Sequence, residues 1–197
     1  MEGVEVADTY GYLLGVWNVE RPIEDYHCGM SGAFAGSVSV CQLVGELSLA
    51  AHAGAPPARR QADYRECGTL RWSGRELACA RRMLLADTGQ GRAALRFADG
   101  RHFVDVDFGT GGCEVRHDCG DDVYLIKFLV QSADCYEERW EVKGPDKDYR
   151  ADGTYRRDRG EVVRESGFCF GVGDAHQGPS LKSRRTESAI ASCVPPE

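Results

Sequence analysis

Residues 117–157 read HDCGDDVYLIKFLVQSADCYEERWEVKGPDKDYRADGTYRR, and this stretch decides the fold. Within it, apolar and polar residues alternate over the runs 123–130, 135–143 and 149–157. A period of two is typical of half-buried β-strands, because successive side chains point to opposite faces of a sheet. Polar turns such as Gly144-Pro145-Asp146-Lys147 separate the runs. The stretch therefore predicts three consecutive antiparallel strands, and its alternation sets which side chains face the core.

The same pattern continues toward the N-terminus. Further strands are predicted over residues 11–23, 30–41, 62–72, 77–86, 92–97, 101–108 and 113–118. The Asp99-Gly100 step between two of these segments is a strong signal for a tight β-hairpin. About ten short strands at regular spacing, without a convincing long helix, indicate an all-β barrel or sandwich. Because successive hairpins favour pairing in sequence order, we expect a single up-and-down antiparallel β-barrel of about 8–10 strands.

The chain divides into a barrel domain and a long C-terminal extension. The predicted domain covers residues 1–158 and contains an insertion loop, residues 43–60, that interrupts the alternation. Within this loop the alanine-rich segment 45–55 favours a short helix, which Pro56-Pro57 would end. Residues 159–197 show little alternation and several glycines, so we expect a tail outside the barrel.

Composition limits the class of partner. The net charge of -7 argues against nucleic-acid binding, because contacts with phosphates need a basic field. We find no apolar run of about 18 residues and no features of a secretory signal or mitochondrial presequence, so we expect a cytoplasmic protein without a membrane span. The nine cysteines then read as reduced thiols. Cys113, His117 and Cys119 would share one strand face, but their spacing matches no common zinc pattern, so we expect no metal.

Short motifs add a resemblance to a known superfamily. Gly15-x-Trp17, near the start of the predicted barrel, resembles the Gly-x-Trp opening of the calycin superfamily, which includes lipocalins and fatty-acid-binding proteins. In lipocalins this tryptophan packs against an arginine of the last strand. The resemblance therefore implies a cation–π contact between Trp17 and either Arg156 or Arg157.

A longer ordered set of motifs resembles a little-studied lipocalin-like family of unknown function, over residues 11–157. The set comprises Leu14-Gly15-x-Trp17, Arg21-x-Ile23, Tyr64-x-Glu66-x-Gly68, Asp99-Gly100-Arg101, His117-x-Cys119-Gly120-x-Asp122-x-Tyr124 and Trp140-x-Val142-x-Gly144-Pro145-x-Lys147-Asp148-Tyr149. The 43–60 insertion and the extra cysteines depart from the pattern of that family. The resemblance implies the barrel and brings no established activity with it.

Several polar and aromatic residues face the interior if the apolar faces do. A barrel of this size can hold one small ligand, so we predict a binding site inside it. Its candidate residues are Arg21, Glu66, His117, Tyr124, Tyr136, Glu138 and Trp140. The alternative is that Arg21 neutralises Glu66 or Glu138 in a closed structural network, because buried charges persist only when they are paired.

Three functions remain open. The one we favour is a non-catalytic lipocalin-like barrel that binds a small, partly apolar ligand. The second is a structural or assembly subunit that docks on a protein partner through the 159–197 tail and the 43–60 loop. The third is an enzyme, an isomerase, cyclase or hydrolase, in which His117 acts with Glu66 or Glu138 as acid and base. We expect no cofactor, and haem with His117 or His102 as axial ligand is the alternative.

Overall fold

The computed structural model describes residues 3–44 and 60–160, which form one short helix and ten strands. The elements are α1 (Thr9–Leu13), β1 (Gly15–Asp25), β2 (Met30–Gln42), β3 (Gln61–Trp72), β4 (Arg75–Gly89), β5 (Arg92–Phe97), β6 (His102–Val106), β7 (Gly112–Cys119), β8 (Asp122–Ser132), β9 (Cys135–Lys143) and β10 (Asp148–Arg157). Within these two ranges no helix is long and apolar enough to cross a membrane. The helix expected within 45–55 and the tail beyond residue 160 lie outside the described residues.

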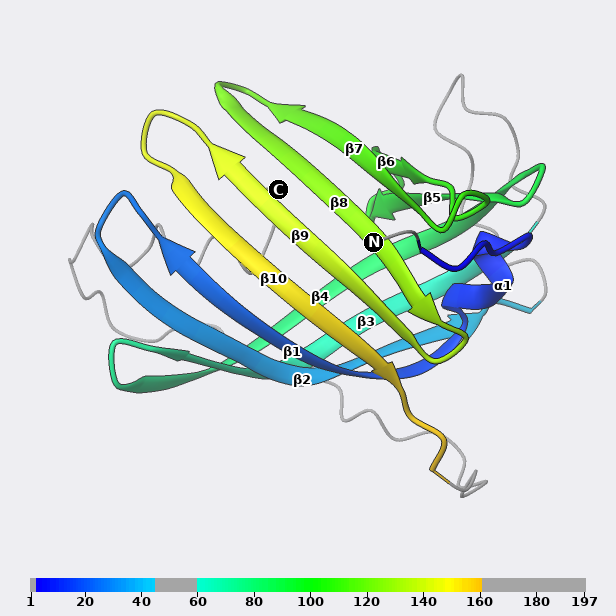
Figure 1. Ribbon diagram of the computed structural model, residues 1–197, viewed down its shortest axis with the longest axis horizontal. Coiled ribbons are helices and arrows are strands. Elements are labelled where there is room, and N and C mark those ends of the chain that lie inside the picture. The colour runs from blue at the N-terminus through cyan, green and yellow to red at the C-terminus, as the bar shows by residue number, and fades with distance from the viewer. Residues whose placement is uncertain (1–2, 45–59, 161–197) are drawn as a thin grey trace.

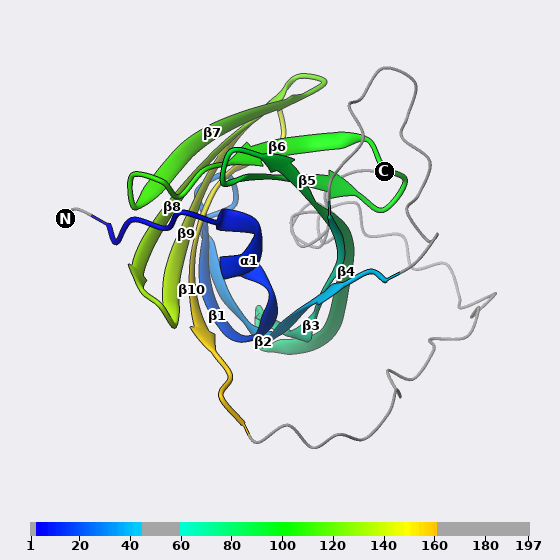
Figure 2. The same cartoon turned by 90° about the vertical axis from the view of Figure 1, so that its right-hand side faces the viewer.

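The strands form one antiparallel sheet that curls into a nearly closed barrel (Figure 1, Figure 2). The hydrogen-bonded order is β6-β5-β4-β3-β2-β1-β10-β9-β8-β7, so the first and last strands pair with each other. Strands β6 and β7 lie side by side at the two edges of this order, and we call the line between them the seam. The predicted all-β, up-and-down antiparallel barrel is therefore confirmed.

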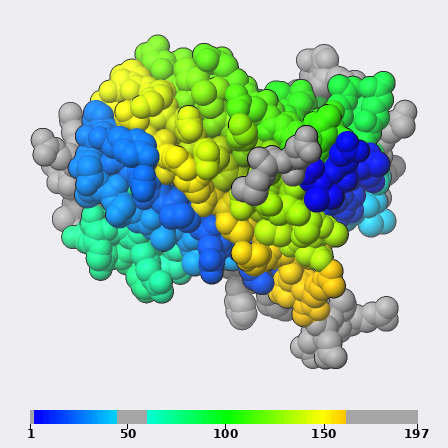
Figure 3. All heavy atoms as spheres, viewed as in Figure 1, coloured from blue at the N-terminus to red at the C-terminus, as the bar shows by residue number. Residues whose placement is uncertain are grey.

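Side chains alternate between the interior and the outer surface as the period of two requires. Every second residue of β1 from Trp17 to Ile23 is buried, and the residues between them are exposed. Glu66 and Glu138 are 3% and 5% exposed, which places both carboxylates inside the barrel. The side chain of Arg139, next to Glu138 in the chain, is 48% exposed. On the outside, the strands β1, β10 and β9 form one continuous surface (Figure 3).

Helix α1 lies across one end of the barrel, which we call the closed end (Figure 2). The Asp8 side chain accepts a hydrogen bond of 3.0 Å from the Gly11 amide and so caps the helix. The amide of Thr9 donates to the Gly91 carbonyl at 2.9 Å. The Thr9 hydroxyl accepts from the Phe108 amide at 3.0 Å. These bonds fix the helix to the ends of β5 and β6.

The predicted start of the first strand, residue 11, is wrong. Residues Thr9–Leu13 are helical, and β1 begins at Gly15. The backbone φ of Gly15 is 111°, in a region that residues with a side chain rarely adopt. This glycine lets the chain pass from α1 into β1 within two residues, and a strand pattern read from alternation alone does not detect that turn.

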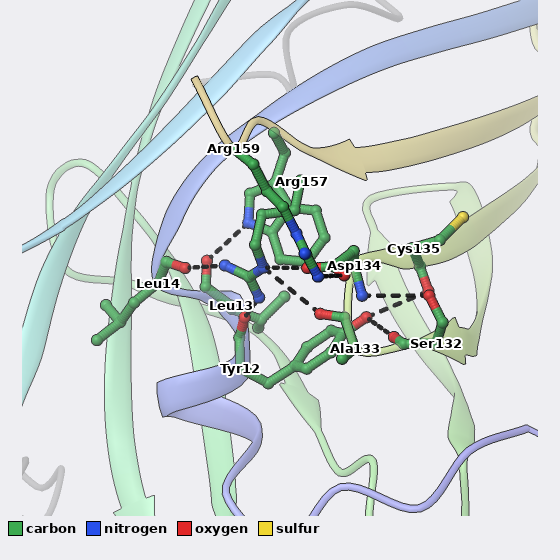
Figure 4. Close-up of polar contacts among 10 residues, drawn as sticks. Tyr12, Leu13, Leu14, Ser132, Ala133, Asp134, Cys135, Arg157 and Arg159 are labelled. Atoms are coloured by element: carbon green, nitrogen blue, oxygen red, sulfur yellow. Dashed lines mark hydrogen bonds and ion pairs between the residues drawn. The ribbon is translucent and has the colours of Figure 1, made fainter. Parts of the chain in front are cut away.

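Arg157 holds the closed end together (Figure 4). Its guanidinium carbon lies 4.0 Å from the centroid of the Trp17 ring. Its Nη1 and Nη2 atoms donate to the main-chain carbonyls of Leu14 and Tyr12, both at 2.7 Å. Of the two arginines that the lipocalin resemblance left open, Arg157 thus makes the contact with Trp17, and Arg156 is exposed on the outer face.

Candidate functional site

The burial of inward-facing side chains changes along the barrel. Near the closed end Trp17, Phe108 and Tyr136 are fully buried, whereas Tyr12 and Cys113 are partly exposed. At the opposite end, which we call the far end, several remain partly exposed although they pack against the core. These are Met30, Leu77, Cys79, Phe97, Cys119 and Trp140, with His117 beside them. The far end is therefore where interior side chains meet solvent.

A chain of hydrogen bonds links charged groups across the interior. Arg21 on β1 donates from Nη1 and Nη2 to the two carboxylate oxygens of Glu66 on β3, at 2.8 and 3.0 Å. Arg21 Nη2 also donates to the Tyr155 hydroxyl at 2.6 Å, and that hydroxyl donates to Oε2 of Glu138 at 2.8 Å. The same oxygen accepts from Trp140 Nε1 at 3.0 Å. Groups from β1, β3, β9 and β10 thus form one network.

Arg81 on β4 turns this chain of contacts into a ring, which we call the polar ring. Its Nη2 donates to Glu66 Oε2 at 2.7 Å. Its guanidinium carbon lies 5.7 Å from the centroid of the Trp140 ring and 5.8 Å from that of Tyr64. The side chain is only 9% exposed, and no group in residues 3–44 and 60–160 forms a hydrogen bond with its buried Nε. Arg81 therefore connects Glu66 to Trp140, by a hydrogen bond on one side and a cation–π contact on the other.

Charge is unevenly distributed around the polar ring. Burial alone would raise the pKa of Glu66, but the charges of Arg81 and Arg21 outweigh this effect and lower that pKa to about 2. Burial would lower the pKa of Arg81, yet Glu66 raises it above its ordinary value. All three groups stay ionised, so two guanidinium groups share one carboxylate. Among the described residues, Glu138 accepts hydrogen bonds from the neutral donors Tyr155 and Trp140.

Tyr155 was not among the predicted site residues, although it joins the two halves of the network. Burial raises the pKa of its hydroxyl well above the ordinary value, so the group stays protonated and can donate to Glu138. Its ring stacks on that of Tyr136, with 4.4 Å between centroids and 9° between planes. The alternation of the last strand places Tyr149, Ala151 and Tyr155 on one buried face, which was the available signal.

An aromatic cluster lies between the polar ring and the seam. It comprises Phe97, Phe103, His117, Tyr124 and Trp140. Phe103 stacks on Trp140 with 5.9 Å between centroids and 21° between planes. The rings of Phe103 and His117 are 4.7 Å apart. Of these residues Phe97, His117 and Trp140 are partly exposed, so the cluster presents ring surface at the far end.

Tyr124 is tied to the hairpin between β9 and β10. Lys147 Nζ donates to the Tyr124 hydroxyl at 2.9 Å and to Asp122 Oδ2 at 2.6 Å. Burial is the largest single effect and would lower the pKa of Lys147, but the hydrogen bonds and electrostatic attraction to Asp122 and Tyr124 together raise it. A protonated lysine between a hydroxyl and a carboxylate is a clamp that positions Tyr124 in the aromatic cluster.

The predicted binding residues divide between the two features. Around the polar ring lie Arg21, Glu66, Tyr136, Glu138 and Trp140, and in the aromatic cluster lie His117, Tyr124 and again Trp140. His117 contacts the Phe103 carbonyl with Nδ1 rather than either of the two buried carboxylates. The exposed side chain of His102 lies on the outer face, with its Nε2 atom 3.2 Å from Oδ1 of Asp105. Across residues 3–44 and 60–160, no three metal-ligating side chains gather into a candidate site.

Arg81 is not among the predicted site residues, because the strand pattern over residues 77–86 does not by itself decide which side chains face inward. Leu77, Met83 and Leu85 are apolar and in phase with Arg81, and this phase places its side chain inward. The register of β3 with β4 then sets Arg81 directly opposite Glu66. Both signals are present in the sequence once the β3–β4 turn is recognised.

Comparison with known protein families finds one match. The family of unknown function DUF6314 matches residues 13–157, from the last residue of α1 to the last residue of β10. No curated protein matches the chain by sequence.

Several solved structures share the barrel. The S-type phycobiliprotein lyase CPES from Guillardia theta is 12% identical, with a TM-score of 0.58 over 76% of this chain and 90% of that chain. A DUF3598 protein of unknown function from Nostoc punctiforme is 10% identical, with a TM-score of 0.45 over 76% of this chain and 49% of that chain. A designed fluorescence-activating β-barrel is 17% identical, with a TM-score of 0.37 over 78% and 100%. The first similarity supports a calycin-like fold, and fold alone does not define function.

Proposed function

We propose that this chain, which belongs to the family of unknown function DUF6314, is a non-catalytic barrel that binds a small, partly apolar molecule. The molecule would lie at the far end of the interior, against the aromatic cluster. One observation carries the proposal: Phe97, His117 and Trp140 face inward and yet remain partly exposed. The Trp17 ring at the closed end is fully buried, while that of Tyr12 beside it is partly exposed.

Exposed apolar surface inside a barrel is costly. Removing apolar surface from water stabilises a complex by about 25 cal/mol for each Å². A ligand that covers the exposed parts of these rings gains this free energy without any rearrangement of the sheet. Small-ligand sites combine such apolar walls with a few polar groups that fix orientation. Here Arg81 and Glu138 lie on either side of Trp140 and supply a donor and an acceptor.

The position of His117 favours a binding function over a catalytic one. Its Nδ1 donates to the carbonyl oxygen of Phe103, since a carbonyl can only accept. Among the interactions of the described chain, none joins His117 by a hydrogen bond to Glu66 or Glu138. An acid and a base that act together need such contact, directly or through one water. The assembly alternative rests on residues 43–60 and 159–197, most of which lie outside the described ranges.

A fluorescent probe tests the proposal. Phenylnaphthylamine is uncharged and its emission rises in apolar surroundings, so the wild-type protein should enhance its fluorescence saturably. Trp140→Ala and Phe97→Ala should each weaken binding about tenfold, because each removes ring surface worth about 1.4 kcal/mol or more. Arg139→Ala, an outward-facing neighbour of Trp140, is the matched control and should bind as the wild type does.

Circular dichroism of each variant would confirm that the barrel remains folded. The proposal fails if the wild type does not enhance the probe, or if the Trp140 and Phe97 variants bind it as well as the Arg139 control.

A further inference from the structure

Arg81 carries more hydrogen-bonding capacity than its surroundings use. A guanidinium group has five N–H donors. The structure gives Arg81 one hydrogen bond, from Nη2 to Glu66 Oε2 at 2.7 Å. Its Nε is buried and has no hydrogen-bond partner among the described residues, and the whole side chain is 9% exposed. A buried donor without a partner costs about 1–3 kcal/mol, so a group that accepts from this edge would be favoured.

Glu66 pairs with two buried arginines in different geometries. Arg21 already binds both Glu66 oxygens in the two-pronged geometry that suits a carboxylate, at 2.8 and 3.0 Å. Arg81 is thus a second buried cation on a carboxylate that is already paired. The other buried carboxylate, Glu138, forms no ion pair with Arg81 among the described contacts. Arg81 therefore shares its one paired carboxylate with Arg21.

The aromatic rings near Arg81 define the shape of a ligand that could bind to it. The guanidinium carbon lies 5.8 Å from the Tyr64 ring and 5.7 Å from the Trp140 ring. Beyond Trp140 the aromatic cluster continues to Phe103 at 5.9 Å between centroids. A ligand that reaches the arginine from the far end must pass along this ring surface. Its charged end and its aromatic body would therefore occupy adjacent parts of the site.

We propose that Arg81 binds the carboxylate of the ligand, and that the ligand is a small aromatic carboxylate whose ring packs against Trp140. This inference rests on the proposed function and specifies the chemistry of the same site. A carboxylate supplies acceptors in the planar arrangement that a guanidinium edge matches. It would also accept a hydrogen bond from Arg81 Nε, which has no partner among the described residues.

A matched pair of probes tests this inference. Naphthalene carboxylate and the corresponding uncharged naphthalene carboxamide share the ring and differ in charge. We expect the wild-type protein to bind the carboxylate at least about tenfold more tightly, since hydrogen bonds to charged groups contribute about 1.5–3 kcal/mol. Fluorescence titration of the two probes at one salt concentration gives the ratio of dissociation constants.

Variants of Arg81 separate charge recognition from the apolar site. Arg81→Met should abolish the preference for the carboxylate and retain binding of the carboxamide. Arg81→Lys, which keeps the charge but not the planar edge, should retain part of the preference. Arg82→Met is the matched control, because Arg82 lies on the outer face and pairs with Asp63. It should preserve the wild-type ratio.

The outcomes are distinguishable. If the wild type binds neither probe, the proposed binding function fails together with this inference. If it binds both probes equally, or if Arg81→Met and Arg81→Lys keep the preference in a folded protein, the assignment of Arg81 is overturned while the binding function stands. Far-end binding of the carboxamide by Arg81→Met also shows that this variant still folds.

Discussion

The Nδ1 atom of His117 lies 3.1 Å from the main-chain carbonyl oxygen of Phe103, and this contact joins the two edges of the sheet. His117 is on β7 and Phe103 on β6, the strands that flank the seam. At the seam a side-chain hydrogen bond connects β6 and β7, whereas backbone hydrogen bonds connect the other neighbouring strands of the barrel. The stacked rings of Phe103 and Trp140 extend the bridge to β9.

Loss of the His117 side chain should destabilise the barrel at the seam. His117→Ala removes a partly buried hydrogen bond and the ring contact with Phe103, so we expect the free energy of unfolding to fall by about 1–2 kcal/mol. Urea denaturation measures the difference. His102→Ala provides the control, because His102 is exposed near the same seam and should change stability by less than about 0.5 kcal/mol. Equal effects of the two substitutions would contradict the bridging role.

The same histidine should make stability depend on pH. Burial lowers the pKa of His117, and this outweighs the opposing hydrogen bond to the Phe103 carbonyl. A depressed pKa means that the folded protein favours the neutral ring. The contribution is therefore present above the unfolded-state pKa of about 6.5 and is lost as the pH falls through the lower folded-state value. The stability difference between the wild type and His117→Gln, measured in urea from pH 8 down to about pH 5, should shift against the wild type below about pH 6.5. A constant difference would refute this linkage.

The facing of Glu66 and Glu138 could be predicted because it depends on a local property. A strand with a period of two has only two faces, and neighbouring apolar residues decide which one is inside. The opposition of Glu66 and Arg81 was also within reach. Ser73 and Gly74 both have positive φ, at 49° and 74°, as a two-residue hairpin turn requires. Counting outward from that turn pairs residue 66 with residue 81.

The seam could not be predicted in this way. Which residues of β6 and β7 meet depends on how far the sheet curls, and therefore on strand number, tilt and stagger together. No turn fixes the register of His117 against Phe103, because the two strands share no backbone ladder in the hydrogen-bonded order. The helical start at Thr9–Leu13 was missed for a different reason: five residues are too few to show a helical period.

Glu66 should be the most sensitive member of the polar ring. Glu66→Gln leaves Arg21 and Arg81 facing each other without a carboxylate, so we expect a loss of about 3–5 kcal/mol in the free energy of unfolding. Glu137→Gln changes an exposed carboxylate on the outer face and should be nearly neutral. Urea denaturation of both variants compares the two sites, and a loss below about 1 kcal/mol for Glu66→Gln would contradict the structure.

The stability of the folded protein at acid pH should depend on the ionisation of Glu66. The pKa of Glu66 is lowered from 4.5 to about 2 in the folded protein, so its contribution is present above pH 4.5 and is lost as the pH falls through about 2. The wild type should therefore lose stability relative to Glu66→Gln over this window. Thermal melts of the two proteins at closely spaced pH values would measure it, and parallel curves would exclude a depressed pKa at Glu66.

Tyr155 should matter through its hydroxyl rather than its ring. Tyr155→Phe keeps the stacking on Tyr136 but leaves Arg21 Nη2 and Glu138 Oε2 each without one partner. Arg21 Nη2 keeps its bond to Glu66 and Glu138 Oε2 keeps that from Trp140. A hydrogen bond to a charged group contributes about 1.5–3 kcal/mol, so we expect a loss of about 1–3 kcal/mol in urea denaturation. Tyr136→Phe tests the specificity, since the structure records no hydrogen bond from its hydroxyl among the described residues. A Tyr136 effect as large as that of Tyr155 would point to ring packing instead of the network.

The closed end should depend on Arg157 and not on its neighbour. Arg157→Ala removes the cation over Trp17 and the donors to the partly buried carbonyls of Leu14 and Tyr12. A cation–π contact contributes about 0.5–1 kcal/mol and each unsatisfied carbonyl costs about 1 kcal/mol or more, so we expect a loss of about 2–3 kcal/mol. Arg156→Ala, on the exposed face, should cost less than about 0.5 kcal/mol. Because α1 is held by these carbonyls, hydrogen exchange at the amides of residues 9–14 should accelerate in Arg157→Ala alone. Unchanged exchange there would mean that the Asp8 cap and the Thr9 bonds hold the helix without the arginine.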